Sequence, residues 1–116
     1  MNDTKKIIEY LLDNQADFLR VLQKAVELES PTYEKEASAQ CGTYFQNLYR
    51  SLGFNITVLP QEDCGDHFIA ELGDEGETLY FVGHYDTVYP LGTLATMPWK
   101  IQDGKVYGPG ALDMKG

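Results

Sequence analysis

A continuous run of apolar residues, Thr78 to Gly83, constrains the fold of this chain more than any other feature. Apolar and polar residues do not alternate along it, which is typical of a strand buried on both faces of a sheet. An abrupt change to polar residues at His84 marks the end of this strand. The run therefore predicts an α/β layer built around at least one central strand.

Helical periodicity dominates the sequence before this run. Apolar residues between Ile7 and Val26 recur at helical spacing, and Asp3 and Thr4 are suited to cap the start of the helix. Asn14 marks a break or a kink, so the pattern fits one helix or two. The segment 30–32, Ser-Pro-Thr, ends the pattern because proline does not fit inside a helix.

A second helix is expected from about Tyr33, and Gly53 follows it where a left-handed C-cap is needed. Its apolar face consists of Ala37, Cys41, Tyr44, Phe45, Leu48 and Leu52. These helices precede several strands in the sequence. We therefore expect N-terminal helices packed on a mixed β-sheet, part of which is missing from this chain.

Shorter strands flank the apolar run. Residues 54–59 alternate between apolar and other residues and are followed by proline, and residues 67–72 form a second candidate strand. Residues 73–76 resemble a hairpin turn. Residues 99–107, with Asp103-Gly104 at their centre, predict a β-hairpin.

Composition narrows the class of protein. The chain has 116 residues with 43% apolar and 23% charged residues, which is globular composition and excludes a disordered chain. A net charge of −9 argues against nucleic-acid or anionic-membrane partners, and no apolar run approaches the ~18 residues of a membrane helix. The two cysteines are too few for a disulfide framework, so we expect a cytoplasmic protein. The seven acids of residues 62–77 are interpreted as solvated surface.

His84 and Asp86 follow the central run directly. Side chains two residues apart on a strand point to the same face, so the imidazole and the carboxylate are expected side by side. Two interpretations are open. Either Asp86 caps the following turn and His84 is a polar residue at the strand end, or His84 binds a metal while Asp86 accepts the proton of its other ring nitrogen.

Asp113 lies in a second polar motif at the end of a glycine-rich segment. Residues 107–110, Tyr-Gly-Pro-Gly, predict a tight turn that fixes the place of Asp113. A carboxylate at such a place can bridge two divalent ions. The alternative is a loop in which Asp113 caps a helix beginning at Met114.

The two motifs together resemble a known family. Residues 83–90 with Gly92-Thr93, followed by residues 107–110 with residues 113–116, look like the M20 family of dinuclear zinc metallopeptidases. The resemblance is greatest to its glutamate carboxypeptidase (carboxypeptidase G2-like) branch. It implies that residues 1–116 are the N-terminal part of a three-layer catalytic, metal-binding domain. The rest of that domain and a dimerisation domain would be absent.

This resemblance also implies roles for single residues. His84 would be a terminal ligand of one zinc ion, Asp113 would bridge two zinc ions, and Asp86 would be the active-site carboxylate that orients His84. Cobalt or manganese could replace zinc. The family's general base, in a Glu-Glu pair, and the remaining ligands would follow Gly116, so the isolated chain is expected to be inactive and to bind zinc weakly or not at all.

The resemblance implies a metal-dependent hydrolase of peptides or other amides, acting on a small peptide or an N-acyl amino acid. A carboxypeptidase that releases a C-terminal residue such as glutamate fits best, and the full-length protein would be a homodimer. Three alternatives stay open: an acyl-amino-acid deacylase or desuccinylase of the same fold, a non-catalytic α/β scaffold domain, and a truncated product.

Overall fold

The computed structural model describes residues 2–116, and the α/β class expected from the sequence is confirmed. The described elements, in chain order, are α1 (Asp3–Asp13), α2 (Gln15–Glu27), α3 (Lys35–Ser51), β1 (Asn55–Leu59), β2 (His67–Glu71), a 3₁₀ helix η1 (Thr93–Ala95), β3 (Lys100–Gln102) and β4 (Lys105–Tyr107). Both strand pairs, β1–β2 and β3–β4, are antiparallel, and the parallel pairing found in residues 2–116 is a single bridge between Pro31 and Thr87. None of the helices in this range is both long and apolar enough to cross a bilayer.

The N-terminal helical pattern forms two helices that meet at Asn14. The Asn14 side-chain amide donates a hydrogen bond of 2.8 Å to the carbonyl oxygen of Tyr10 and so closes the end of α1. The expected cap at Asp3 or Thr4 is wrong by one or two residues. Asn2 is the N-cap, and its side-chain oxygen accepts a hydrogen bond from the Thr4 amide at 3.1 Å.

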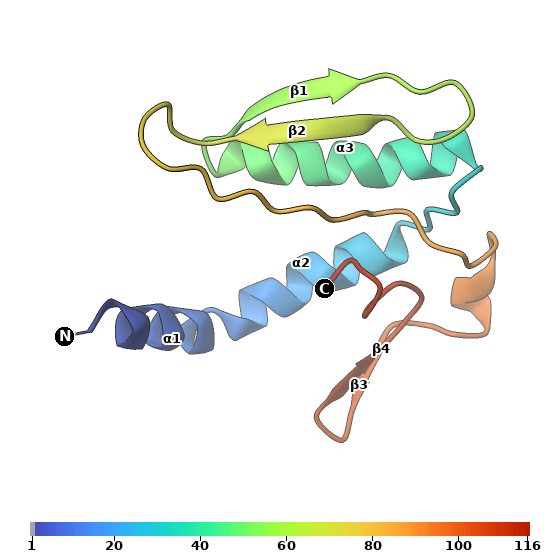
Figure 1. Cartoon of the computed structure of the whole chain (residues 1–116). Helices are drawn as coiled ribbons and strands as arrows, with labels where there is room; N and C mark the ends of the chain where they lie inside the picture. Colours follow the sequence, from blue (N-terminus) through green and yellow to red (C-terminus); the bar gives the residue numbers. More distant parts are fainter. Residues whose placement is uncertain (1) are drawn as a thin grey trace.

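A small core lies where α2 meets α3. Ala25, Val26 and Cys41 are completely buried there. The α3 helix ends at Ser51, and Gly53 adopts the expected left-handed conformation with φ of +90°. Figure 1 shows α3 lying along the β1–β2 pair, so one face of this pair is covered by the helix.

The prediction of a buried strand at residues 78–83 is wrong for the structure. These residues have no regular hydrogen-bonded structure, and the side chains of residues 79–82 are between 75% and 87% exposed. A strand exists only when a neighbour supplies hydrogen-bond partners, and no strand within residues 2–116 pairs with this run. Residues 73–76 therefore close no hairpin. Instead, the chain runs as an extended trace past β2 and α3 (Figure 1).

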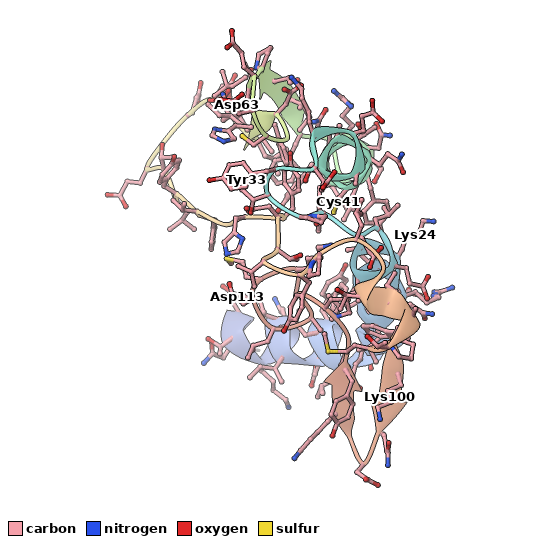
Figure 2. The ribbon with its side chains drawn as sticks, turned by 90° about the vertical axis from the view of Figure 1, so that its right-hand side faces the viewer. Lys24, Tyr33, Cys41, Asp63, Lys100 and Asp113 are labelled. Carbon is pink, nitrogen blue, oxygen red and sulfur yellow. The ribbon has the colours of Figure 1, made fainter. Side chains whose placement is uncertain are left out.

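The molecule is accordingly open in shape. Its radius of gyration is 15.8 Å, above the roughly 13 Å of a compact domain of this length. The hairpin expected around Asp103-Gly104 is confirmed as β3–β4, with both turn residues at positive φ. Figure 2 shows this hairpin, marked by Lys100, extending away from the loop that carries Asp113.

Candidate metal centre

The extended segment becomes fixed where it reaches residues 85–87. The Ser30 hydroxyl donates to the carbonyl oxygen of Tyr85 at 2.6 Å, and the Thr87 amide donates to the carbonyl oxygen of Ser30 at 2.8 Å. The Thr32 amide donates to the carbonyl oxygen of Thr87 at 3.2 Å. The segment that ends the helical region thus forms a short parallel contact beside the two polar residues His84 and Asp86.

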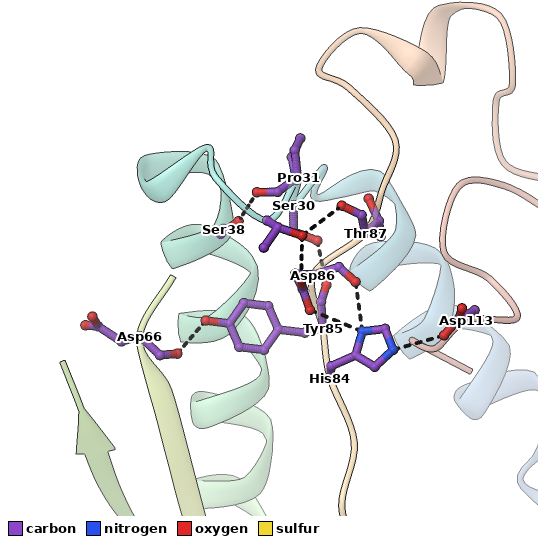
Figure 3. Close-up of polar contacts among 10 residues, drawn as sticks. Ser30, Pro31, Ser38, Asp66, His84, Tyr85, Asp86, Thr87 and Asp113 are labelled. Carbon is purple, nitrogen blue, oxygen red and sulfur yellow. Dashed lines mark hydrogen bonds and ion pairs between the residues drawn. The ribbon is translucent and has the colours of Figure 1, made fainter. Parts of the chain in front are cut away.

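The imidazole of His84 lies between two carboxylates (Figure 3). Its Nδ1 atom is 3.2 Å from Oδ1 of Asp86 and 3.0 Å from the carbonyl oxygen of the same residue. Its Nε2 atom is 2.9 Å from Oδ1 of Asp113. The structure therefore brings together the three residues that sequence analysis selected, from segments 29 residues apart.

These contacts favour the protonated ring. The hydrogen bond to the Asp86 carbonyl is the largest cause that raises the pKa of His84, and the Asp113 carboxylate adds to it, with desolvation acting in the opposite direction. Both ring nitrogens face acceptor oxygens, which only an imidazolium satisfies with a proton on each side. The position of the ring between the two acids thus raises the pKa of His84 above its ordinary value.

Asp86 has a further partner that sequence analysis missed. Its Oδ2 atom accepts a hydrogen bond of 2.6 Å from the Thr32 hydroxyl, while its Oδ1 atom faces His84. The sequence predicts Thr32 only as part of the segment that ends a helix. The available signal was a hydroxyl residue directly after Pro31, but nothing in the sequence placed it next to Asp86.

Asp113 is delivered by turns rather than by a helix. Residues 108–114 form a bend and turns, and the alternative of a helix that begins at Met114 with Asp113 as its cap stays a prediction. Two residues later, the buried Lys115 ammonium donates to the carbonyl oxygens of Ala25 at 2.9 Å and Leu28 at 2.8 Å, at the end of α2. Burial lowers the pKa of Lys115. This lysine ties the loop of Asp113 to the helical core, and the Asp113 side chain itself stays 84% exposed.

The donor set suits a divalent metal but is incomplete. An imidazole nitrogen and a carboxylate oxygen are ordinary ligands of zinc, and a metal at their contact would take the place of the proton on Nε2. Structural and catalytic zinc sites use at least three protein ligands. No group of three or more His, Cys, Asp or Glu side chains in residues 2–116 is arranged to hold an ion. The described residues therefore fit as two ligands of a site.

Comparison with known proteins gives relatives but no matching family model. The chain is 34% identical over 107 residues to carboxypeptidase G2 of Pseudomonas sp. (strain RS-16), a match covering 90% of this chain and 26% of that protein. It is 40% identical over 80 residues to a succinyl-diaminopimelate desuccinylase of Rhodospirillum centenum, covering 61% of this chain and 20% of the relative. It is 37% identical over 101 residues to a protein of the same name from Methylobacillus flagellatus, covering 83% and 26%.

These relatives are much longer than the chain, which spans about a quarter or less of their length. All three matches nevertheless point to one family of hydrolases, and they agree with the family that the two sequence motifs resemble. Over the part of its relatives' length that it spans, the chain therefore belongs to the M20 family, which contains both the carboxypeptidase and the desuccinylases.

Proposed function

We propose that this chain contributes part of the metal-binding active site of an amide hydrolase. His84 and Asp113 are its metal ligands, and Asp86 is the active-site carboxylate that orients His84. The observation that carries the proposal is the position of the His84 ring, with Nε2 against Asp113 and Nδ1 against Asp86. A carboxylate on the second nitrogen of a ligating histidine fixes its tautomer and increases its basicity.

The metal would supply Lewis-acid chemistry, polarising the scissile carbonyl and lowering the pKa of a water molecule. The chain's own residues have separate tasks around it. Asp86 holds the ring so that Nε2 is directed to the side of Asp113, and Thr32 holds Asp86. Asp113, with its exposed carboxylate, has an oxygen free for a second ion, which supports a site for two zinc ions or for cobalt or manganese.

We further propose a carboxypeptidase activity that releases a C-terminal residue such as glutamate, in a longer cytoplasmic protein that is a homodimer. The match to carboxypeptidase G2 covers 90% of the chain and supports this choice. Desuccinylation of an N-succinyl amino acid is the second candidate, supported by the two desuccinylase matches. Residues 1–116 would be the N-terminal part of the catalytic domain, and alone they would have no activity.

Metal binding by the 116-residue chain is the direct test. Zinc titration with a competing chelator is expected to give weak binding that the variants His84→Ala and Asp113→Ala abolish. His67→Ala is the matched control, because His67 lies on β2 and is the other histidine of the chain. This variant should leave binding unchanged. Equal loss in all three variants, or tight binding that survives His84→Ala, would contradict the proposed ligands.

Activity is measured on the 116-residue chain and on the longer protein encoded by the full reading frame. The chain alone should hydrolyse neither a dipeptide with C-terminal glutamate nor an N-succinyl diamino acid. The longer protein should hydrolyse one of them, and which substrate it prefers separates carboxypeptidase from desuccinylase. Zinc-dependent turnover by the chain alone, or a reading frame that stops at Gly116, would contradict the proposal.

A further inference from the structure

Tyr85 lies in the sequence between the site residues His84 and Asp86, and its side chain points away from the His84 ring. Figure 3 shows the phenol ring directed toward α3 and the loop of Asp66, whereas His84 is directed toward Asp113. The Tyr85 hydroxyl donates a hydrogen bond of 2.5 Å to the carbonyl oxygen of Asp66. Because neighbouring side chains of an extended segment point to opposite faces, fixing Tyr85 fixes the direction of its neighbours.

Two aromatic rings lie beside the Tyr85 ring. Its centroid lies 6.4 Å from that of Phe68 on β2, with the planes inclined by 24°, and 6.4 Å from that of Phe45 on α3. Aromatic pairs at such distances contribute about 0.5–1.5 kcal/mol beyond the area they bury. Tyr85 thereby joins the site segment to both layers of the fold.

Two glycines shape the slot that receives the phenol. A methyl group placed on Gly42 of α3 would lie 2.8 Å from the Tyr85 hydroxyl oxygen, and one placed on Gly65 would lie 2.7 Å from it. Both distances are shorter than a normal van der Waals contact. The backbone of α3 and of the loop at Gly65 therefore approaches the tyrosine as closely as the chain allows.

The preceding residues offer no comparable support. Residues 79–82 are largely exposed and have no strand partner within the described part of the chain. Along the run from residue 72, Tyr85 is the first side chain held by packing and by a hydrogen bond at the same time. The direction of His84 thus depends on the residues that follow it, where the Tyr85 side chain and the hydrogen bonds of residues 85–87 to Ser30 and Thr32 hold the segment.

We propose that Tyr85 is a positioning residue, which sets the direction of His84 and Asp86 through its slot between α3 and the loop at Gly65. The inference rests on the proposed function in one respect only, namely that His84 is a ligand. Tyr85 contacts no reacting group. Its effect is transmitted through the backbone to the contact between His84 and Asp113.

The test compares Tyr85→Leu with Tyr49→Leu. Tyr49 belongs to the same aromatic cluster, with its ring 6.0 Å from Phe68, but it is on α3 and remote in sequence from the site. Both variants remove one tyrosine ring, so a merely structural role predicts equal losses. Tyr85→Phe, which deletes only the hydroxyl, serves as the milder change should Tyr85→Leu fail to fold. Gly65→Ala disturbs the slot from its other side, because its methyl group would meet both the Tyr85 hydroxyl and Ser38.

The main readout needs no metal. In nitrogen-15 NMR spectra of the chain at one fixed pH, the His84 ring N–H protons should be protected from exchange with water by their carboxylate partners. We expect Tyr85→Leu and Gly65→Ala to abolish this protection and Tyr85→Phe to reduce it. Tyr49→Leu should preserve it, and the ring signals of His67 provide the reference within each spectrum.

Zinc affinity is the second readout. Tyr85→Leu should lower it by about tenfold, as loss of an orienting partner does in metal sites, while Tyr49→Leu should stay within about twofold. The inference is overturned if both leucine variants act alike or if the parent chain shows no protected His84 signal. A parent chain that protects His84 but whose zinc binding survives His84→Ala contradicts the proposed function alone, and the NMR comparison still decides on Tyr85.

Discussion

The Thr32 hydroxyl donates a hydrogen bond of 2.6 Å to Oδ2 of Asp86 across 54 residues of the chain. Through this contact, the segment that ends the helical region holds the carboxylate that in turn holds His84. In Thr32→Val the shape of the side chain is kept and the donor is lost. We expect the free energy of unfolding, measured in urea, to fall by about 1–2 kcal/mol, because the carboxylate loses its hydroxyl partner.

Thr32→Ser is the control for this prediction, since it keeps the hydroxyl and removes only a methyl group. It should stay within about 0.5 kcal/mol of the parent chain. The exchange protection of the His84 ring N–H protons should also decrease in Thr32→Val and persist in Thr32→Ser. A serine variant as unstable as the valine variant would show that the methyl group, not the hydrogen bond, stabilises this contact.

Local signals explain why parts of the fold were predictable. Asn14 lies where α1 and α2 meet, Pro31 lies in the connection between α2 and α3, and Asp103-Gly104 adopts positive φ in a tight turn. Each of these features follows from a few adjacent residues. The alternation of residues 84–86 needs no partner either, and it placed His84 beside Asp86. These features depend on a short stretch of chain, so the sequence contains all that decides them.

Features that depend on distant residues were not predictable in this way. The run 78–83 has the composition of a buried strand, but it becomes a strand only beside another strand, which residues 2–116 do not provide. The partner of Asp86 is Thr32, and the acceptors of Lys115 are carbonyl groups of α2 about 90 residues earlier. No pattern within one stretch of sequence records such pairs.

The pKa of His84 in the metal-free chain should lie above the ordinary value of histidine, and NMR titration of its ring carbons measures it. Asp113→Asn should lower this pKa because it removes the charged partner of Nε2. Asp86→Asn should leave part of the increase, since the largest cause is the main-chain carbonyl of that residue. A pKa in Asp86→Asn that falls to the ordinary value of histidine would contradict this order of causes.

The sign of the related stability effect follows from the same direction. A histidine whose pKa is raised by folding stabilises the folded chain fully below its unfolded pKa, and this contribution is lost as the pH rises through the folded pKa. The parent chain should therefore lose stability relative to His84→Gln as the pH rises from the unfolded-state pKa of His84 through its folded-state pKa. The ring is 48% exposed, so solvent screens the effect and the comparison concerns its direction.

Lys115 offers a prediction about the core. Lys115→Met keeps an unbranched side chain, one atom shorter, and removes the ammonium that satisfies the carbonyls of Ala25 and Leu28. We expect urea unfolding to show a loss of about 2–3 kcal/mol, because two acceptors at the end of α2 lose their donor. Lys105→Met on the exposed β4 strand is the matched control and should change stability by less than about 0.5 kcal/mol. Equal effects of the two substitutions would exclude a special role for the buried lysine.

Alkaline stability tests the burial of Tyr85. Burial is the largest cause that raises the pKa of its phenol, to about 12. The folded chain therefore keeps this proton at a pH where the unfolded chain, with an ordinary tyrosine pKa of about 10, has lost it. Stability should fall as the pH rises between these two values, by at most about 2–3 kcal/mol.

Comparison with Tyr85→Phe isolates this contribution. Burial also raises the pKa of Cys41, which acts in the same direction, and lowers that of Lys115, which acts in the opposite direction. Both groups are present in the parent chain and in the variant, so their effects cancel in the difference. Free energies of unfolding measured from about pH 9 upward should fall more steeply for the parent chain than for Tyr85→Phe. Parallel curves would mean that the phenol is as accessible to solvent in the folded chain as in the unfolded one, and Tyr85 would not occupy the slot between Gly42 and Gly65.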